Sequence, residues 1–316
     1  RLARLSLLPA HARAIPLEGC APQAAHPEPA ARAAYVAGVE CAKAHIVDGD
    51  IFQVVLSTQE RQPFEGDSFD AYRLLRMANP SPYHFFLEQE EATLVGASPE
   101  LLVRVVDRRM EVRPIAGTRP RGATPGEDER LKAELLADPK EAAEHVMLVD
   151  LGRNDVGRVC TYGSVSVDAF RVVEPYSHVI HLVSSVSGTL REDAHPVDAL
   201  FAAFPAGTVS GAPKIRAMEL IHTLEPVGRG VYAGAVGYLD YRGHLDTCIA
   251  IRTTVIKDGV AQVQAGAGIV ADSVPDKEFD ECRHKMGSVH AALGAAQPVA
   301  AAPLPRLERP LVAYVP

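Results

Sequence analysis

Residues 236–269 read VGYLDYRGHLDTCIAIRTTVIKDGVAQVQAGAGI, and this stretch decides the fold. Its segments are rich in β-branched and apolar residues, which is typical of strands, and they follow one another as hairpin-like pairs. We expect one strand over residues 232–241, a second over 248–259 and a third over 260–270. Strands joined as hairpins pair antiparallel, so the stretch predicts an antiparallel sheet.

The rest of the chain alternates strand-like and helix-like segments. Further strands are expected at residues 51–58, 93–98, 101–107, 110–117, 164–173 and 178–190. Helices are expected at residues 32–47, 141–156, 195–204, 211–226 and 275–293. Asp138-Pro139 places a capping side chain before a proline, which is typical of a helix start. The pattern favours an α+β fold of stacked, largely antiparallel sheets flanked by helices over a doubly wound parallel sheet.

The composition limits the class of protein and its partners. The chain has 316 residues, of which 47% are hydrophobic and 23% charged, as in ordinary globular proteins. The net charge of -8 argues against nucleic acid or an anionic membrane as the main partner. No apolar stretch approaches the about 20 residues of a membrane span. The cysteines form no C-x-x-C pair, which is typical of isolated thiols in a reducing compartment, so we expect a cytoplasmic location.

Composition also divides the chain into three segments. Residues 1–33 are rich in Ala, Pro, Arg and His, and we interpret them as a remnant of an upstream region followed by a linker. Residues 34–292 show a dense alternation of helix and strand signals, and we expect them to form the main domain. Residues 293–316 are again rich in Ala and Pro, which is typical of a tail or tether.

Two Glu-x-x-Glu segments are the most informative chemical feature. Glu141 and Glu144 lie three residues apart on one predicted helix, and Glu278 and Glu281 on another. This spacing places both carboxylates of a pair on one helical face. Carboxylates that converge from two faces require a cation, and Mg²⁺ prefers such oxygen ligands. The alternative is that each pair lies on a solvated helix face.

Several polar residues interrupt apolar runs. His178 and His181 lie three apart in a predicted strand, so at most one of them faces a given cavity. Arg252 lies in a run that is otherwise apolar, and a buried guanidinium group requires an anionic partner, either a substrate carboxylate or a structural salt bridge. Gly266 and Gly268 allow backbone N–H groups to approach an anion, although a tight turn explains them equally well. The string GTVSGAPK lacks the spacing of a phosphate loop.

Ten segments carry a resemblance to a known family. They include DGDIFQVVLS, NPSPYHFFL, GASPELLVRV, RPIAGTRPRG, EHVMLVDLGRNDVGRV, PAGTVSGAPKIRAMELI and AGAGIVADSVPDKEFDE, and together they span residues 48–285. In this order they resemble the chorismate-utilising enzymes, most closely the component I (large-subunit) branch of the anthranilate synthases. The resemblance implies that Mg²⁺ binds chorismate and that anthranilate and pyruvate are the products.

The resemblance implies roles for individual positions. Glu144 and Glu281 match direct Mg²⁺ ligands, and Glu141 and Glu278 complete the shell directly or through water. Glu100 matches the general acid that protonates the departing hydroxyl, which is otherwise a poor leaving group. His181 matches a histidine near that hydroxyl. Thr208 and Thr118 match two residues of the pocket. The groups that hold the substrate's carboxylates match Tyr232, Arg252, Lys285, Gly266 and Gly268.

Two positions separate the branches of the family by their nucleophile. The isochorismate and salicylate synthases carry a lysine that activates water where this chain has Gln53, and a neutral amide cannot act as a base. The aminodeoxychorismate synthases typically carry a nucleophilic lysine where this chain has Ala116. Both positions favour ammonia as the nucleophile at C2. The alternatives are aminodeoxychorismate, aminodeoxyisochorismate or isochorismate synthesis, and an inactive chorismate-binding fragment.

The resemblance also implies partners. Ammonia would come from a glutamine amidotransferase on another chain or further along this one, so a hetero-oligomer is expected. Pro80, Ser81 and Tyr83 match part of a pocket through which tryptophan inhibits the family, and a Pro-rich turn is the alternative. The LLES string of that pocket is absent from residues 1–47, so we expect the N-terminal part of the fold to be incomplete.

Overall fold

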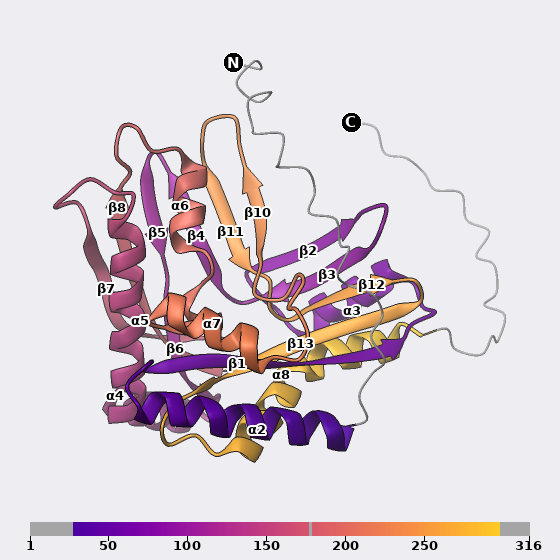
Figure 1. Ribbon diagram of the computed structural model, residues 1–316. Helices are drawn as coiled ribbons and strands as arrows, with labels where there is room; N and C mark the ends of the chain where they lie inside the picture. The colour runs from indigo at the N-terminus through magenta and orange to yellow at the C-terminus, as the bar shows by residue number, and fades with distance from the viewer. Residues whose placement is uncertain (1–27, 177–178, 298–316) are drawn as a thin grey trace.

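The structure is a computed structural model that describes residues 28–176 and 179–297. Within these ranges, helices flank two antiparallel sheets (Figure 1), which confirms the predicted α+β fold. The helices are α2 (Glu28–Val47), α3 (Ser68–Ala78), α4 (Pro125–Ala137), α5 (Pro139–Gly157), α6 (Pro196–Ala203), α7 (Lys214–Leu224) and α8 (Pro275–Ala295), with a short 3-10 helix η1 (Gly207–Val209).

Sheet A has the strand order β2-β3-β12-β13-β1-β9. These strands are β1 (Gln53–Pro63), β2 (Tyr83–Glu88), β3 (Thr93–Ser98), β9 (Gly211–Ala212), β12 (Thr253–Lys257) and β13 (Val260–Ile269). Helices α2 and α8 lie below this sheet in Figure 1, and α3 packs against α8 and β3. Their apolar faces form its core, in which Phe279, Met286 and Leu293 of α8 are almost fully buried. Burial of such side chains stabilises the layer by about 1.5–3 kcal/mol each.

Sheet B has the order β10-β11-β4-β5-β8-β6, and β7 also pairs with β8. These strands are β4 (Leu101–Val106), β5 (Arg109–Val112), β6 (Ile115–Pro120), β7 (Ser166–Pro175), β8 (Val179–Thr189), β10 (Ala235–Leu239) and β11 (Leu245–Ile249). Helices α5 and α6 pack on this sheet, and its core contains Met110, Val156 and Leu190.

One sequence prediction is wrong, at the place where the chain passes from one sheet to the other. The stretch 248–259 is not one strand, because β11 ends at Ile249 in sheet B and β12 begins at Thr253 in sheet A. Arg252 has a φ of 52°, in the left-handed region that a non-glycine residue rarely adopts and that regular strand geometry does not use. The chain therefore crosses between the sheets at this residue.

Most other predicted elements are confirmed. Helix α5 begins at Pro139 with Asp138 as its N-cap, and the Asp138 side chain accepts from the N–H of Lys140 and Glu141. The segment predicted as one strand at 110–117 is divided between β5 and β6. Helices α3 and α4 and strand β2 were not predicted. Helix α3 buries Ala71 and Leu75, which lie four residues apart on one helical face, so a local signal for this helix was present.

The division into three segments stays a prediction, since residues 1–27 and 298–316 lie outside the described part. Helix α2 begins before residue 34, and α8 ends after residue 292.

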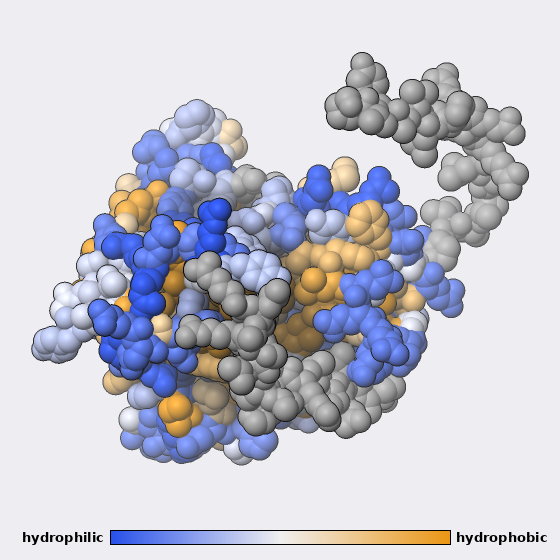
Figure 2. All heavy atoms as spheres, turned by 90° about the horizontal axis from the view of Figure 1, so that it is seen from above, coloured by the Kyte–Doolittle hydropathy of each residue, from blue (hydrophilic) through white to orange (hydrophobic). Residues whose placement is uncertain are grey.

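Seen from above, hydrophobic side chains gather in a patch over the right half of the molecule (Figure 2). Within 28–176 and 179–297, no helix is long and apolar enough to cross a membrane.

Candidate active site

Two chain crossings lie side by side where the sheets meet. The connection between β3 and β4 contains Glu100, and the connection between β11 and β12 contains Arg252. The backbone N–H of Ile249 donates to the carbonyl of Glu100 at 3.0 Å, and the N–H of Ala97 donates to the carbonyl of Arg252 at 3.1 Å. These bonds hold a carboxylate and a guanidinium group close together between the sheets.

Glu100 is a carboxylate in an environment that favours its neutral form. Burial raises the pKa of Glu100 to about 7, and Thr208, Lys285 and Arg252 oppose this rise only in part. Thr208, in η1, is close enough to act on this pKa. Its buried Oγ1 nevertheless forms no hydrogen bond within the described residues. A carboxyl group with this pKa holds its proton at neutral pH about half of the time, as a general acid requires.

Arg252 is a cation placed between the two sheets. Among residues 28–176 and 179–297, no ion pair or hydrogen bond to its guanidinium group is found, which removes the alternative of a salt bridge within this part. Burial lowers the pKa of Arg252, while Tyr232, Glu281 and Glu100 oppose that change. Lys285 of α8 lies near the same group, where its Nζ donates to the carbonyl of Gly266 at 2.9 Å and pairs with Glu281 at 2.6 Å.

The two glycines lie inside strand β13 and not in a turn. A Cβ atom at Gly266 would lie 2.7 Å from the Tyr232 hydroxyl, and one at Gly268 would lie 2.4 Å from Nε2 of Gln53. Any side chain would therefore displace Tyr232 or Gln53. Glycine is therefore required at both positions because the side chains of Tyr232 and Gln53 pass directly over them, which the sequence did not show.

His181 and Thr118 meet on strands β8 and β6. Nδ1 of His181 lies 3.0 Å from Oγ1 of Thr118 and 3.3 Å from the carbonyl oxygen of Gly117. Burial lowers the pKa of His181, and Arg252 lowers it further. The ring is therefore neutral near pH 7. His178 lies outside the described residues, so the choice between the two histidines stays a prediction.

The two Glu-x-x-Glu segments approach each other from α5 and α8. Burial raises the pKa of Glu144, and the charges of Glu141 and Glu281 add to this rise. Burial likewise raises the pKa of Glu278, again with a contribution from Glu281. Within the described part of the chain, however, no three His, Cys, Asp or Glu side chains lie close enough together to hold one ion.

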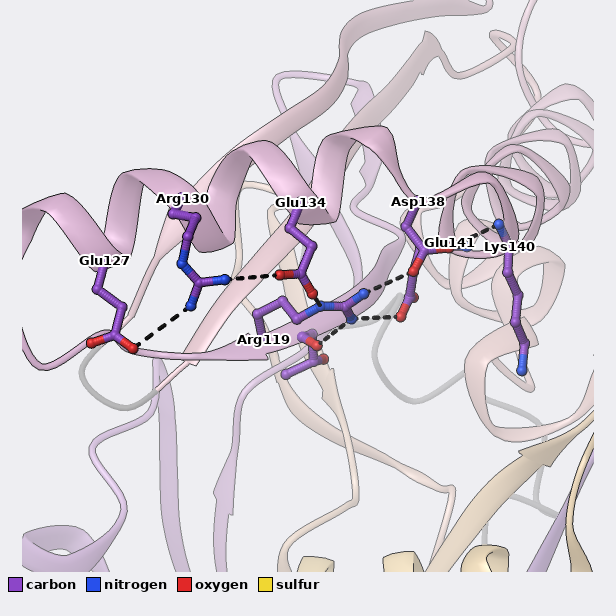
Figure 3. Close-up of polar contacts among 8 residues, drawn as sticks. Arg119, Glu127, Arg130, Glu134, Asp138, Lys140 and Glu141 are labelled. Atoms are coloured by element: carbon purple, nitrogen blue, oxygen red, sulfur yellow. Dashed lines mark hydrogen bonds and ion pairs between the residues drawn. The ribbon is translucent and has the colours of Figure 1, made fainter.

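Arg119 explains part of this separation. Its guanidinium group lies among three carboxylates and pairs with Glu141 at 2.9 Å, Asp138 at 2.8 Å and Glu134 at 3.2 Å (Figure 3). Glu141 is therefore engaged by an arginine that the sequence analysis did not single out. The signal was present, since Arg119 lies in the quoted string RPIAGTRPRG.

The donor set nevertheless fits a magnesium ion. Glu144 keeps one oxygen for other partners, because only its Oε1 accepts from Nε2 of Gln53, at 3.1 Å. Burial raises the pKa of Glu144 and Glu278, neighbouring carboxylates raise it further, and a divalent cation would relieve that repulsion. Mg²⁺ keeps several water ligands in proteins, so it does not need three carboxylates in direct contact.

The residues matched to the tryptophan pocket form a separate set of polar contacts. The Tyr83 hydroxyl donates to Oδ1 of Asp246 at 2.9 Å, and Arg104 pairs with the same carboxylate at 2.9 Å. The N–H of Ser81 donates to Nε2 of His84 at 3.1 Å. Pro80 lies in the connection between α3 and β2. These contacts join the two sheets through β2 and β11.

A further buried pair was missed. Lys214, in the string rejected as a phosphate loop, forms an ion pair of 2.8 Å with Asp155, and both side chains are at most 10% exposed. Nothing local in the sequence relates these residues, which are 59 positions apart.

Comparison with known proteins agrees with this arrangement. A profile of the family described as chorismate binding enzyme matches residues 13–291. The chain is 55% identical over 263 residues to anthranilate synthase component 1 of Bacillus caldotenax, which covers 83% of this chain and 52% of that protein. The chain thus spans about half the length of the curated relatives that it matches.

Solved structures share the fold. Anthranilate synthase component I of Streptococcus pneumoniae TIGR4 has a TM-score of 0.77 and 47% identity, over 82% of this chain and 57% of that one. The menaquinone-specific isochorismate synthase of Escherichia coli has a TM-score of 0.76 and 27% identity, over 83% of this chain and 61% of that one. Since the family profile covers most of the sequence, the chain belongs to the chorismate binding enzyme family.

Proposed function

We propose that the chain converts chorismate and ammonia to anthranilate and pyruvate in a Mg²⁺-dependent reaction. The observation that carries this proposal is the partly buried Glu100, whose pKa is raised to about 7 beside the cations Lys285 and Arg252. A proton donor beside two cations suits a dianionic substrate from which a hydroxyl must depart. The identity of 55% to a named anthranilate synthase component 1 supports the same reaction.

The side chains of the site have different roles in this reaction. Arg252, Lys285 and the Tyr232 hydroxyl bind the substrate's carboxylates and fix the ring. Glu100 gives its proton to the C4 hydroxyl as the C–O bond breaks, so the group leaves as water. His181, held neutral against Thr118, orients that hydroxyl.

Glu144 and Glu281 would hold Mg²⁺, with Glu141 and Glu278 assisting directly or through water. When bound, the ion supplies positive charge that positions the ring carboxylate and stabilises negative charge on it. Gln53 orients Glu144 through the hydrogen bond from its Nε2.

The choice of nucleophile rests on two positions. Gln53 and Ala116 are both buried, and neither offers a basic nitrogen to the ring. Ammonia is nucleophilic without a base, whereas water is not, so amination at C2 is favoured over hydration. Release of the aminated intermediate without pyruvate elimination is the alternative outcome.

We further propose a glutamine amidotransferase partner as the source of ammonia, a hetero-oligomeric enzyme and a cytoplasmic location. Tryptophan would act at Pro80, Ser81 and Tyr83. The Tyr83–Asp246 bond supports this last point, because it would let a ligand at β2 act on the sheet that carries β11. Tyr83→Phe should weaken inhibition by tryptophan without a change in kcat, and unchanged inhibition would remove the assignment.

The proposal is tested by incubating the chain with chorismate, Mg²⁺ and ammonium at mildly alkaline pH. Anthranilate is followed by its fluorescence and pyruvate by a coupled dehydrogenase. Both products should appear in equal amounts and only with Mg²⁺. Chorismate consumed without anthranilate would indicate a different branch of the family, identified by its product. No consumption in the presence of the metal would contradict the proposal.

A further inference from the structure

A small cavity lies next to Glu100. It has a volume of about 50 Å³, and Glu100 and Thr208 form part of its wall. One water molecule needs about 10–15 Å³ of this measure, so the cavity has room for a short chain of about three. We call it the rear cavity.

The rear cavity is separate from the groups that would hold the substrate. Arg252, Tyr232, Lys285 and His181 are absent from its lining, which comes instead from β4, α5, the end of β5 and the connection to β6, and the segment from the end of α6 through η1. Glu100 and Thr208 are the site residues that it shares. A molecule in this cavity would therefore reach the carboxyl group of Glu100 without passing the substrate.

Thr208 shows that the cavity is polar where it meets Glu100. Its Oγ1 is buried, lies close enough to the Glu100 carboxylate to lower the pKa of that group, and has no other polar partner among the described residues. The hydroxyl can donate to Glu100 but its oxygen still lacks a donor, and a buried polar atom without a partner is destabilising. Water in the rear cavity would remove this cost, and such a site with polar partners is one that water fills.

Other residues that line the cavity are charged, and one of them is partly exposed to solvent. Asp155, paired with Lys214, lines it, and burial raises the pKa of this carboxylate. Arg113 lines it as well, and the side chain of Arg113 is 36% exposed, in an ion pair of 2.6 Å with Glu174. The cavity thus extends from Glu100 to a side chain that reaches bulk solvent.

We propose that the rear cavity holds a chain of water through which Thr208 supplies protons from solvent to Glu100 while the substrate occupies the site. This inference rests on the proposed function, in which Glu100 gives up a proton in each turnover. The Thr208 hydroxyl donates to the Glu100 carboxylate and accepts from the nearest water. One proton enters from solvent for each hydroxyl that leaves as water, and the nitrogen that joins the ring returns one proton to solvent.

Thr208→Val tests this route, because it removes the hydroxyl and keeps the shape. Enzyme and chorismate are mixed first, with Mg²⁺ and without ammonium, and ammonium then starts the reaction in a stopped-flow instrument. At about pH 6 Glu100 carries its proton before the substrate binds, and the variant should react in one phase at nearly the wild-type rate. At about pH 8 the variant should show a small fast phase and a slow phase, whereas the wild type shows one fast phase.

The slow phase should be about tenfold slower or more, since general acid–base steps contribute factors of about 10²–10⁴. A Thr208 that only shapes the pocket would slow the reaction equally at both pH values, and that result would overturn the proposal. Ala206→Val, which narrows the same cavity without touching the hydroxyl, should reproduce the two phases. Thr254→Val is the matched control, because its hydroxyl is bonded to the carbonyl of Gln262 in sheet A.

A crystal structure of the chain tests the inference without turnover. Ordered water within hydrogen-bonding distance of Thr208 Oγ1, continued toward Asp155 or Arg113, is the expected result. A dry cavity, or one closed by its own side chains, would overturn the water chain even in an active enzyme. Ordered water in a chain without turnover would leave the path intact and contradict only the proposed function.

Discussion

At the scale of single residues, the burial of Glu100 has an energetic consequence as well as a chemical one. Its pKa rises from 4.5 to about 7 on folding, so the folded state binds this proton more tightly than the unfolded state. Stability should therefore fall as the pH rises from about 4.5 through about 7. The carboxylate is thus retained against a cost to the fold, as is common for groups that act in catalysis.

Glu100→Gln should remove this cost along with the activity. The variant should be more stable than the wild type by on the order of 2–3 kcal/mol at pH 8, and nearly equal to it at pH 4.5. Thermal denaturation at several pH values measures the difference. The exposed Glu40→Gln serves as the control, and a constant difference across this pH range would argue against a raised pKa at Glu100.

Glu144→Gln and Glu281→Gln test the metal ligands. Each variant should keep its fold, lose turnover at moderate Mg²⁺ and lose the rise in melting temperature that Mg²⁺ gives the wild type. Glu134→Gln is the matched control. This carboxylate also pairs with Arg119, but its side chain is 50% exposed. Full activity in both site variants would remove the assignment.

At the scale of secondary structure, helix α5 is the element that places the carboxylates. Its start is defined by Asp138 and Pro139. Its orientation is defined by packing, since a Cβ at Gly152 would lie 3.2 Å from Val112 of sheet B. His145, next to Glu144, lies 2.6 Å from the Ser184 hydroxyl of β8. This buried contact holds the helix in one rotation, with Glu141 and Glu144 toward α8.

His145 should respond to pH in the direction opposite to Glu100. Burial lowers the pKa of His145 to about 4, so the folded state prefers the neutral ring. Its contribution to stability is present above about pH 6.5 and is lost as the pH falls toward 4. An NMR titration of the ring should give a midpoint near 4, against about 6.5 in the unfolded chain. A midpoint near 6.5 in the folded protein would contradict the burial argument.

At the scale of the whole molecule, a buried ion pair joins distant segments. Arg229 pairs with Glu225 at 2.6 Å and also donates to the carbonyls of Val209 and Val55. The Glu225 carboxylate accepts in turn from the N–H of Ser57 at 2.8 Å. The pair thus ties η1 and the end of α7 to β1 of sheet A.

Arg229→Met should destabilise the protein by about 3–5 kcal/mol, because it leaves a buried carboxylate without its partner. Arg229→Met combined with Glu225→Leu should recover much of this loss, since no unpaired charge remains. Chemical denaturation of the two variants measures the difference. Arg73→Ala, at an exposed pair within α3, should cost at most about 1 kcal/mol. Equal losses in the single and double variants would mean that packing, and not charge, is responsible.

Much of the fold and of the candidate site followed from the sequence alone. Local signals were sufficient for the start of α5, for most strands and for the two Glu-x-x-Glu faces, because capping and side-chain periodicity act over a few neighbouring residues. Glu100, Arg252 and His181 were identified through the resemblance, and the structure places Glu100 and Arg252 together between the sheets.

Only the tertiary structure decided where the chain crosses between the sheets and which charges meet. The break at Arg252 interrupts a run that has every local property of one strand. Arg119 reaches Glu141, and Lys214 reaches Asp155, across separations that no local pattern encodes. The rear cavity likewise depends on how α5 packs against the segment around Thr208. Contacts between residues far apart in the chain depend on the packing of whole elements, which is why the sequence specifies them only through the complete fold.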